Sequence, residues 1–218
     1  MLTTSTNKGL HDFVLQEVLP RYLHPGGLAV DLGAGSGLWA TRLHEVGWQV
    51  SAADLNADSY GADIPFTRID FNQPDFASAI GLGKFGLVTA VEVIEHVESP
   101  IGFLRNIGRL LKPGGVAVIT TPNVDNAPAR VKFFLTGKIR MMDEVSEPTH
   151  ISPIFWGLFK RQFLSRAGVE LAEHRVFPPR SYLCTRPRFT WAFRILAAVL
   201  PGESQLGDNH IFVLQTKT

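Results

Sequence analysis

The sequence predicts an α/β fold built on a doubly wound parallel sheet. Strand-length apolar runs alternate with helical patterns from Leu28 to about residue 120. A glycine-rich turn separates the first apolar run from the helical pattern that follows it. Ligands of such sheets bind beyond the carboxyl ends of the strands, so polar side chains at those ends are candidates for a functional site.

The first half of the chain carries most of this alternation. A largely apolar helical face begins at Leu10 and ends before Pro25-Gly26-Gly27. Ser99 is a helix N-cap, followed by proline at the first helical position. We expect strands from Leu28 and at 48–53, 64–70, 85–91 and 116–120, with helices at 38–46 and 100–111.

The rhythm changes after residue 123. The sequence predicts a helix over 127–135, an irregular polar stretch over 137–150, and a helix that Ser152-Pro153 opens and Gly168 stops. The last two strands are expected at 169–177 and 210–216. The segment between them, 178–208, is longer than a hairpin connection needs.

Length and composition favour a single domain. A chain of 218 residues, 45% of them hydrophobic, can bury a sizeable core. We divide it into an N-terminal helix (1–25), a cofactor-binding half (26–123) and a substrate-covering and closing half (124–218). With 21 basic and 20 acidic side chains, the net charge of +1 does not favour nucleic acid as a partner.

Cysteine usage and the N-terminus bear on location. The single cysteine, Cys184, excludes an internal disulfide framework and fits a reducing compartment, so we expect a cytoplasmic protein. The first six residues lack the pattern of a signal peptide. No apolar run approaches the roughly 18–20 residues of a membrane-spanning helix. The sequence leaves the oligomeric state open.

The glycine-rich turn indicates which ligand binds. Glycines occupy positions 33, 35 and 37, whereas the dinucleotide fingerprint would place its third glycine at position 38, which is Leu38. Asp31, two residues before the first glycine, suits a ligand with an ammonium group and no phosphate better than a pyrophosphate. S-adenosylmethionine is such a ligand, and the pattern Asp-x-Gly-x-Gly-x-Gly resembles the first motif of class I S-adenosylmethionine-dependent methyltransferases.

Three other interpretations of this turn stay open. An NAD-binding oxidoreductase is disfavoured by Leu38 and Asp31. A glycine-rich turn without a ligand is a second alternative, and a non-catalytic cofactor-binding protein of the same fold is a third. In the methyltransferase interpretation the cofactor contacts include Asp31 and the turn residues Gly33, Ala34, Gly35 and Gly37.

The ends of the second and third strands supply further cofactor candidates. Asp54, with Leu55 beside it, can accept hydrogen bonds from both ribose hydroxyls. Asp70 could accept from the adenine amino group, and Phe71 could lie against the ring. Alternatively, Asp70 starts an Asx turn and Phe71 belongs to the core.

The end of the fourth strand narrows the resemblance. Glu92-x-x-Glu95-His96-Val97, followed by a helix and Leu-Leu-Lys-Pro-Gly-Gly, is similar to the ubiquinone-biosynthesis O-methyltransferases over residues 26–123. The resemblance implies a Rossmann-like, mostly parallel seven-stranded sheet with an antiparallel last strand. It also implies methyl transfer to a small-molecule acceptor, most readily at oxygen, with S-adenosylhomocysteine as product. One departure is Gly86, where that group usually has aspartate.

Histidine is suited to removing a proton from the acceptor's hydroxyl near neutral pH, and His96 and His150 are the candidates. Glu92 is expected at the cofactor edge, with Glu95 solvated. In the alternative, Glu92, Glu95 and His96 share one side of a helical turn and bind a divalent metal. We favour the metal-free interpretation, because only three ligands are visible. The remaining histidines are taken as structural.

The irregular segments are candidates for an acceptor cover. Residues 137–155 and 178–208 differ most from a minimal methyltransferase, and we expect them to carry specificity. Residues 187–200 mix arginines with aromatic and aliphatic side chains. We favour a helix packed on the domain over a peripheral membrane surface for this stretch.

Overall fold

The computed structural model describes residues 6–22, 24–143, 148–203 and 205–216. A seven-stranded sheet in the order β3-β2-β1-β4-β5-β7-β6 runs through it. β7 is antiparallel to both of its neighbours, whereas the pairs from β3 to β5 are parallel. The strands are β1 (Leu28–Leu32), β2 (Gln49–Asp54), β3 (Phe66–Arg68), β4 (Phe85–Val91), β5 (Leu111–Pro122), β6 (Val169–Phe177) and β7 (Asn209–Thr216).

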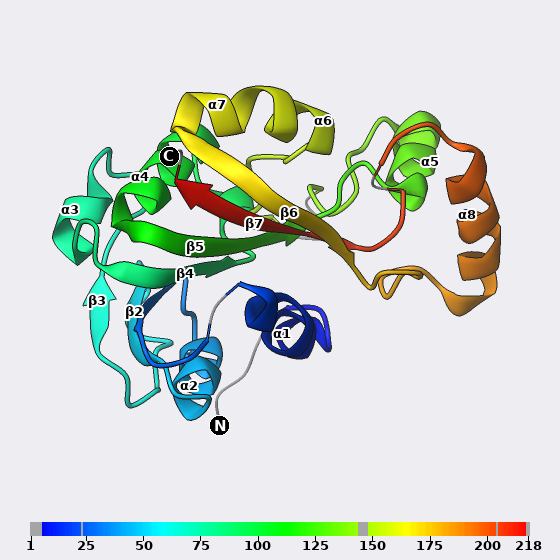
Figure 1. Cartoon of the computed structure of the whole chain (residues 1–218). Helices are drawn as coiled ribbons and strands as arrows, with labels where there is room; N and C mark the ends of the chain where they lie inside the picture. The colour runs from blue at the N-terminus through cyan, green and yellow to red at the C-terminus, as the bar shows by residue number, and fades with distance from the viewer. Residues whose placement is uncertain (1–5, 23, 144–147, 204, 217–218) are drawn as a thin grey trace.

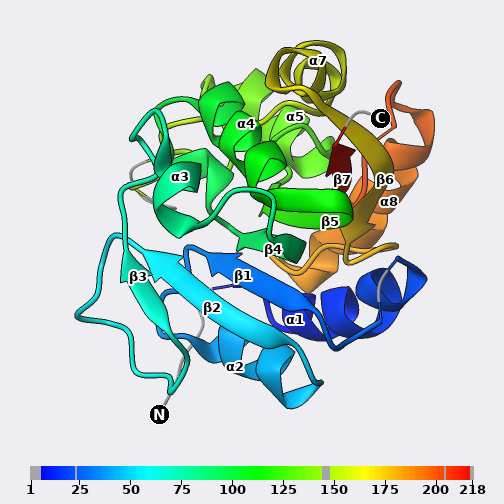
Figure 2. The same cartoon turned by 60° about the vertical axis from the view of Figure 1, so that its left-hand side comes forward.

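Helices cover both faces of this sheet (Figures 1 and 2). The N-terminal helical segment and α2 lie on one face, and α3, α4 and α7 lie on the other. The N-terminal segment comprises α1 (Leu10–Phe13), a π-helical turn η1 (Val14–Val18) and a 3-10 turn η2 (Leu19–Arg21). The other helical elements are α2 (Leu38–Glu45), α3 (Phe76–Ile80), η3 (Ile94–His96), α4 (Pro100–Leu110), α5 (Ala127–Thr136), α6 (Trp156–Leu158), η4 (Phe159–Phe163), α7 (Leu164–Ala167) and α8 (Pro187–Val199).

Each face of the sheet has its own hydrophobic core. Phe103 and Leu104 of α4 pack in one, together with Phe212 of β7. Leu10 of α1 and Leu43 of α2 pack in the other. All seven residues of β4 are buried, as expected for a central strand covered on both sides. The two cores fix the sheet, and the ends of β1, β2 and β4 are thereby held at one edge.

The predicted fold class, including the antiparallel last strand, is confirmed. The predicted bounds of β4 and β6 are also those of the structure. α3 was not predicted, because five residues are too short to show a helical period.

One predicted helix start is wrong. The helix assigned to Ser152-Pro153 begins at Trp156. The Ser152 hydroxyl donates to the carbonyl of Val97, and the Ser152 N–H donates to the carbonyl of Glu95. Ser152 therefore anchors the preceding loop to the sheet edge and does not cap a helix.

α5 and α8 lie side by side at the end of the molecule opposite α3 (Figure 1). Asn126 caps α5 through the N–H of Ala129, and Gly137 ends the helix in a left-handed conformation. α8 confirms the helix expected over 187–200. Among the described residues, no helix is long and apolar enough to cross a membrane.

Candidate active site

The turn between β1 and α2 needs its glycines for different reasons. Gly33 has φ +74°, and a Cβ there would stand 2.3 Å from Val93 Cγ2. Gly35 has φ +53°, and a Cβ there would meet nothing within 4 Å. Gly37, the N-cap of α2, packs against Tyr60 and Ala62. Gly33 thus lets the backbone pass Val93, and Gly35 leaves space for a ligand.

Asp31 is buried at the end of β1, with a side chain 2% exposed. Its Oδ1 accepts a hydrogen bond of 2.9 Å from the Thr89 hydroxyl. Its Oδ2 meets no hydrogen-bond partner among the described residues. Burial, and secondarily the negative charge of Asp54, raise the pKa of Asp31 to about 7. A cationic group of a ligand would satisfy this oxygen and favour its ionised form.

Two cavities flank the turn. One, of about 320 Å³, is lined by Asp31, Gly33, Ala34, Gly35 and Glu92, among others. The second, of about 270 Å³, is lined by Gly33, Asp54, Leu55, Asp70, Phe71, Glu92 and His96, among others. Gly33 and Glu92 belong to both linings, so the two cavities meet there. Of the predicted cofactor residues, Gly37 alone lines neither.

Asp54 ends β2 and organises the loops around it. Its Oδ2 accepts from the Gly35 N–H at 2.8 Å, and its Oδ1 accepts from the Asn56 N–H at 2.9 Å. The first bond ties the β2 end to the glycine turn. A carboxylate retains further acceptor sites when each oxygen already holds one N–H, so ribose hydroxyls can still bind there.

Asp70 and Phe71 have the Asx turn and the core packing of the second interpretation. Asp70 Oδ1 accepts from the Asn72 N–H, which makes an Asx turn, and Phe71 packs edge-on against Phe76 and Phe103. Both residues nevertheless line the second cavity.

Glu92 follows β4 with φ +57°, a strained conformation for a residue that is not glycine. Its N–H donates to Thr120 of β5. Its Oε1 accepts from the Thr120 hydroxyl at 3.2 Å and from the Asn209 amide at 2.8 Å. Burial raises the pKa of the Glu92 carboxyl to about 7, while these two hydrogen bonds oppose the shift.

The structure does not have the alternative arrangement in which Glu92, Glu95 and His96 share one side of a helical turn. Glu92 has a left-handed backbone and lies before the 3-10 turn η3, so it does not share a face with the other two. The structure instead brings Glu95 and His96 together with His150, each with one ligand-capable atom within 4.8 Å of the others.

Glu95 was expected to be solvated, but it is 1% exposed. Burial, and then the charge of Glu92, raise its pKa well above the usual value. Its Oε1 is 3.9 Å from His150 Nε2. The rings of His96 and His150 meet edge to face with centroids 4.6 Å apart. The 137–155 segment therefore returns to the sheet edge at this pair.

His11, taken as structural from the sequence, lines the first cavity with Asp31 and Glu92. Its ring lies 4.7 Å from the Trp39 ring, and burial lowers its pKa to about 4. The apolar helical pattern around His11 does not indicate that this residue lines a cavity, because its place there depends on how α1 docks against α2.

Comparison with known proteins agrees with this geometry. A family model described as a methyltransferase domain matches residues 8–174. The chain belongs to this methyltransferase family. The family predicted from the glycine turn is thereby confirmed.

Similarity to particular methyltransferases is more limited. The chain is 33% identical to a ubiquinone biosynthesis O-methyltransferase of Caulobacter vibrioides over 129 residues, which cover 51% of this chain and 50% of that protein. The chain thus spans about half the length of the curated relatives it matches.

Solved structures show the same fold at low identity. A putative methyltransferase of Bacillus halodurans superposes with a TM-score of 0.66 at 16% identity, covering 96% of this chain and 100% of the other. A 1,6-didemethyltoxoflavin-N1-methyltransferase of Burkholderia thailandensis, solved with 1,6-didemethyltoxoflavin and S-adenosylhomocysteine, gives 0.59 at 15% identity, covering 97% and 80%.

A third, larger cavity of about 550 Å³ lies beyond the end of β5. Its wall is mostly apolar and includes Phe133 of α5, Phe155 and Leu158. Ile139 and Phe155 come from the 137–155 segment, and Gly202 and Glu203 from 178–208. Both segments predicted to cover the acceptor therefore line one cavity. Residues 144–147 and 204 of those segments lie outside the described residues.

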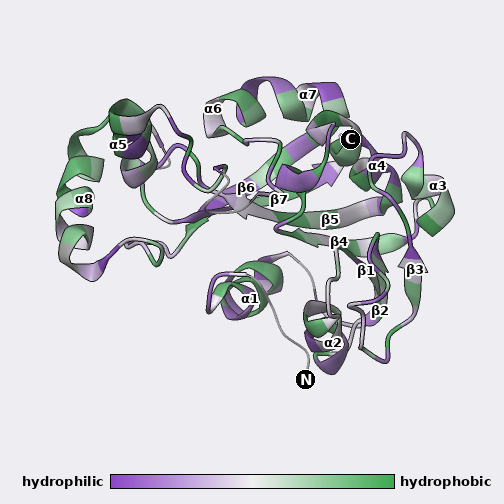
Figure 3. Ribbon diagram, turned by 180° about the vertical axis from the view of Figure 1, so that it is seen from behind, coloured by the Kyte–Doolittle hydropathy of each residue, from purple (hydrophilic) through white to green (hydrophobic). Residues whose placement is uncertain are grey.

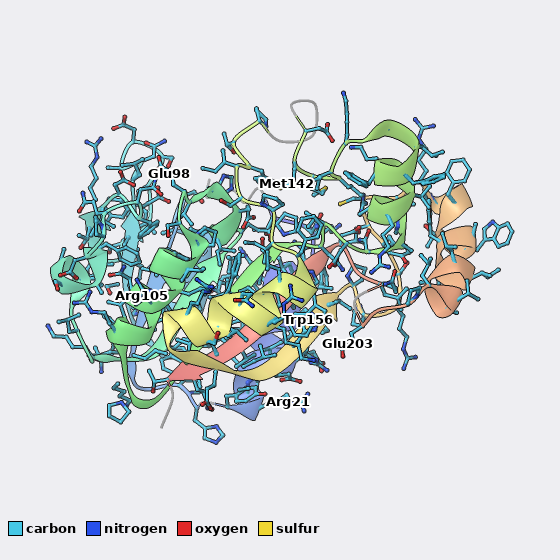
Figure 4. The ribbon with its side chains drawn as sticks, turned by 90° about the horizontal axis from the view of Figure 1, so that it is seen from above. Arg21, Glu98, Arg105, Met142, Trp156 and Glu203 are labelled. Carbon is cyan, nitrogen blue, oxygen red and sulfur yellow. The ribbon has the colours of Figure 1, made fainter. Side chains whose placement is uncertain are left out.

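Trp156 and Glu203 form one side of this cavity and lie next to one another in Figure 4. The Trp156 indole N–H donates to Glu203 at 2.9 Å, and its backbone N–H donates to Asp125. Behind Trp156, His174 stacks on the indole at 3.8 Å. His174 and His210, also taken as structural, hold each other by a ring-nitrogen contact of 3.0 Å.

Proposed function

We propose that this methyltransferase uses S-adenosylmethionine to methylate a small-molecule acceptor at oxygen. The observation that carries the cofactor assignment is the buried Asp31 Oδ2, which meets no partner among the described residues and belongs to a residue that lines the cavity at the glycine turn. The ammonium of the cofactor's methionine part supplies the positive charge this oxygen needs. A pyrophosphate would bring a second negative charge to the same place, so an NAD-dependent reaction is not favoured.

The cofactor would extend from the first cavity to the second. Asp31, Gly33, Ala34 and Gly35 would hold the methionine part, and Gly37 would cap the helix behind the turn. Asp54 and Leu55 would hold the ribose, and Asp70 and Phe71 the adenine. Glu92, which lines both cavities, would lie where the two parts join.

The acceptor side rests on His96 and His150. His96 Nδ1 is 3.1 Å from the carbonyl of Thr149, and His150 Nδ1 is 2.5 Å from that of Met141. A carbonyl oxygen only accepts, so each Nδ1 carries the proton, and in a neutral ring Nε2 holds the lone pair. His96 Nε2 is therefore the nitrogen that would take the proton of an acceptor hydroxyl.

The methyl transfer itself needs alignment more than activation, because the sulfonium is already a good leaving group. The acceptor oxygen forms the new bond to the methyl carbon as the carbon–sulfur bond breaks, and the hydroxyl proton passes to His96. We propose no metal for this step. The apolar cavity beyond β5 would accommodate an apolar part of the acceptor.

The three-part division of a single domain and a cytoplasmic location belong to the same proposal. The lone cysteine, Cys184, supports a reducing compartment. We propose no nucleic-acid partner, because the charges balance.

Mass spectrometry of ligand retained through purification tests the cofactor. Retained S-adenosylhomocysteine, and calorimetric binding of S-adenosylmethionine with which NADH does not compete, are expected. Tight NADH binding without a response to S-adenosylmethionine would refute the assignment.

Activity of His96→Ala tests the acceptor side, on an acceptor found by screening quinols and other hydroxyl compounds. We expect a loss of about 10²–10⁴-fold, the usual worth of a general base. His44→Ala, an exposed histidine of α2, is the matched control and should keep full activity. Full activity of His96→Ala would end the role proposed for His96. Loss of wild-type activity on chelation, restored by magnesium or zinc, would overturn the metal-free step.

A further inference from the structure

The lobe formed by residues 126–142 and 178–202, here called the α5–α8 lobe, exposes an unusual amount of apolar surface. Trp191, Ile195 and Val199 of α8 are 65%, 60% and 74% exposed. Their i, i+4, i+8 spacing places them on one stripe along the helix. α8 is coloured mostly as apolar in Figure 3, and none of its described side chains is buried.

The end of α5 adds to this surface. Phe134 is 87% exposed, Leu135 71% and Phe133 56%. Three consecutive residues of a helix point in different directions around its axis, so they cannot all face the protein core. Part of this run therefore faces solvent. The exposed apolar residues of the described chain are thus concentrated in this lobe.

The charge of the α5–α8 lobe has one sign. It contains no Asp or Glu, whereas the rest of the chain carries all 20 acidic residues and 13 of the 21 basic ones. Lys138, Arg180, Arg186 and Arg194 are exposed. The lobe's basic residues are Arg130, Lys132, Lys138, Arg140, Arg180, Arg186, Arg188 and Arg194.

The lobe is also firmly attached to the sheet. Arg140 forms a buried ion pair of 2.8 Å with Asp208, which is fully buried just before β7. Asp208 Oδ2 also accepts from the Cys184 N–H at 2.9 Å. Within the lobe, Arg130 donates to the carbonyl of Pro201, which ties α5 to the residues after α8. The exposed apolar stripe therefore belongs to a fixed surface of the molecule.

We propose that the α5–α8 lobe docks on the surface of a bilayer that contains anionic lipids. The exposed apolar side chains of α8 and the α5 end would enter the boundary between headgroups and acyl chains, and the exposed Lys138, Arg180, Arg186 and Arg194 would lie among the phosphates. Charge complementarity decides against a second copy of this chain, because two such lobes face to face would bring the exposed Lys138, Arg180, Arg186 and Arg194 of each together without an acidic residue of either lobe between them. The proposal does not depend on the methyl acceptor.

Intrinsic fluorescence offers a direct test on the unmodified protein. Of the four tryptophans, Trp39, Trp48 and Trp156 are 3–6% exposed, and Trp191 is 65% exposed. Vesicles of phosphatidylcholine with about 30% phosphatidylglycerol should shift the emission to the blue, because Trp191 leaves water. Pure phosphatidylcholine vesicles should give a clearly smaller shift, and about 0.5 M salt should weaken the anionic response.

Cosedimentation with the same vesicles tests the residues. Ile195→Asp should reduce binding roughly tenfold or more, by removing apolar burial and adding a like charge. Leu82→Asp changes an exposed leucine near α3, 49% exposed, and should leave binding unchanged. Arg194→Glu should weaken binding to anionic vesicles, whereas Lys112→Glu, an exposed lysine at the start of β5, should not. Unchanged cofactor binding shows that each variant is folded.

Three results would overturn the proposal. One is no blue shift with anionic vesicles. Another is equal binding to neutral and anionic vesicles without a salt response. The third is a shift that grows with protein concentration in the absence of lipid and accompanies dimers in sedimentation velocity, which would assign the face to a second copy. Failure of methyl transfer with vesicle binding intact would count against the proposed function alone.

Discussion

The glycine turn after β1 and the α5–α8 lobe are positioned by different forces. At the turn, backbone conformation and close approach set the geometry: Gly33 passes Val93 at a distance no side chain permits, and the Gly35 N–H is held by Asp54. In the lobe, a few polar anchors such as Arg140–Asp208 hold helices whose apolar residues remain exposed. A site built from backbone tolerates little substitution, whereas an exposed surface can change its side chains without loss of the fold.

The largest effect is expected from Gly33→Ala. The added methyl group would overlap Val93 Cγ2, and the residue would keep a φ of +74°. The variant should lose about 2–4 kcal/mol of the free energy of unfolding, from overpacking and left-handed strain together. Urea denaturation measures this loss.

Gly35→Ala is the matched control for that change. It has a similar φ of +53°, but a Cβ with open space around it. It should cost only about 1–2 kcal/mol of stability from strain, while weakening cofactor binding because the methyl group enters the first cavity. Equal destabilisation by both variants would show that contact with Val93 does not constrain the turn.

Asp54→Ala is expected to weaken S-adenosylmethionine binding by about 1.5–3 kcal/mol, the usual worth of hydrogen bonds to a charged group. Calorimetry measures the change. Asp58→Ala removes an exposed carboxyl from the same loop and should leave affinity unaltered. If the two variants bound equally well, the carboxylate at the end of β2 would not be a ribose ligand.

These residues show how far the sequence predicts the site. The residues expected to bind the cofactor can be proposed from the sequence because their pattern is local. A strand, an acidic residue and glycines occupy adjacent positions, and the strand ends share one edge of the sheet. The sequence does not predict that His11 lines the first cavity, or that His150 lies beside Glu95 and His96. Both depend on how α1 and the 137–155 segment fold back over the sheet. The spacing of Glu92, Glu95 and His96 is compatible with one helical turn. The left-handed backbone of Glu92, which the sequence does not reveal, instead lets its carboxylate accept hydrogen bonds from Thr120 and Asn209.

In the fold, too, locally determined features are predicted and contacts between distant segments are not. β4 and β6 were predicted with their observed bounds, because long apolar or alternating runs are bounded by turn residues. Ser152-Pro153 has the sequence of a helix start, but the hydroxyl is used by Val97 O, a tertiary contact that overrides the local pattern. Errors thus concentrate where distant segments meet.

Cofactor binding at the glycine turn should depend on pH through Asp31. The pKa of Asp31 is raised to about 7 in the folded protein, so below that pH the group is neutral and cannot pair with the ammonium. Affinity should rise with pH up to about 7, by up to about tenfold per pH unit. Asp31→Asn should flatten this rise. Calorimetry from pH 5.5 to 7.5, below the range in which an α-ammonium loses its proton, gives the profile, and an affinity that falls with pH over this range would contradict the ion pair.

In the unliganded protein, the contribution of Asp31 to the free energy of unfolding falls as the pH rises, whereas the affinity for the cofactor rises. Because the folded pKa of Asp31 lies above its unfolded value of 3.8, folding favours the protonated form. The contribution of Asp31 to stability is complete below about pH 4 and is lost as the pH rises to about 7. Bound cofactor should reduce this loss, since the ammonium stabilises the ionised carboxylate.

The smallest effect is expected in the lobe. Trp191 is 65% exposed, so Trp191→Ser should change the free energy of unfolding by no more than about 0.5 kcal/mol. Its cofactor affinity should equal that of the wild type, because the residue lines neither cavity at the glycine turn. Urea denaturation and calorimetry on the same preparation measure both quantities. A loss comparable to that of Gly33→Ala would mean that α8 belongs to the folded core, and the contrast between a backbone-built site and an exposed lobe would then be wrong.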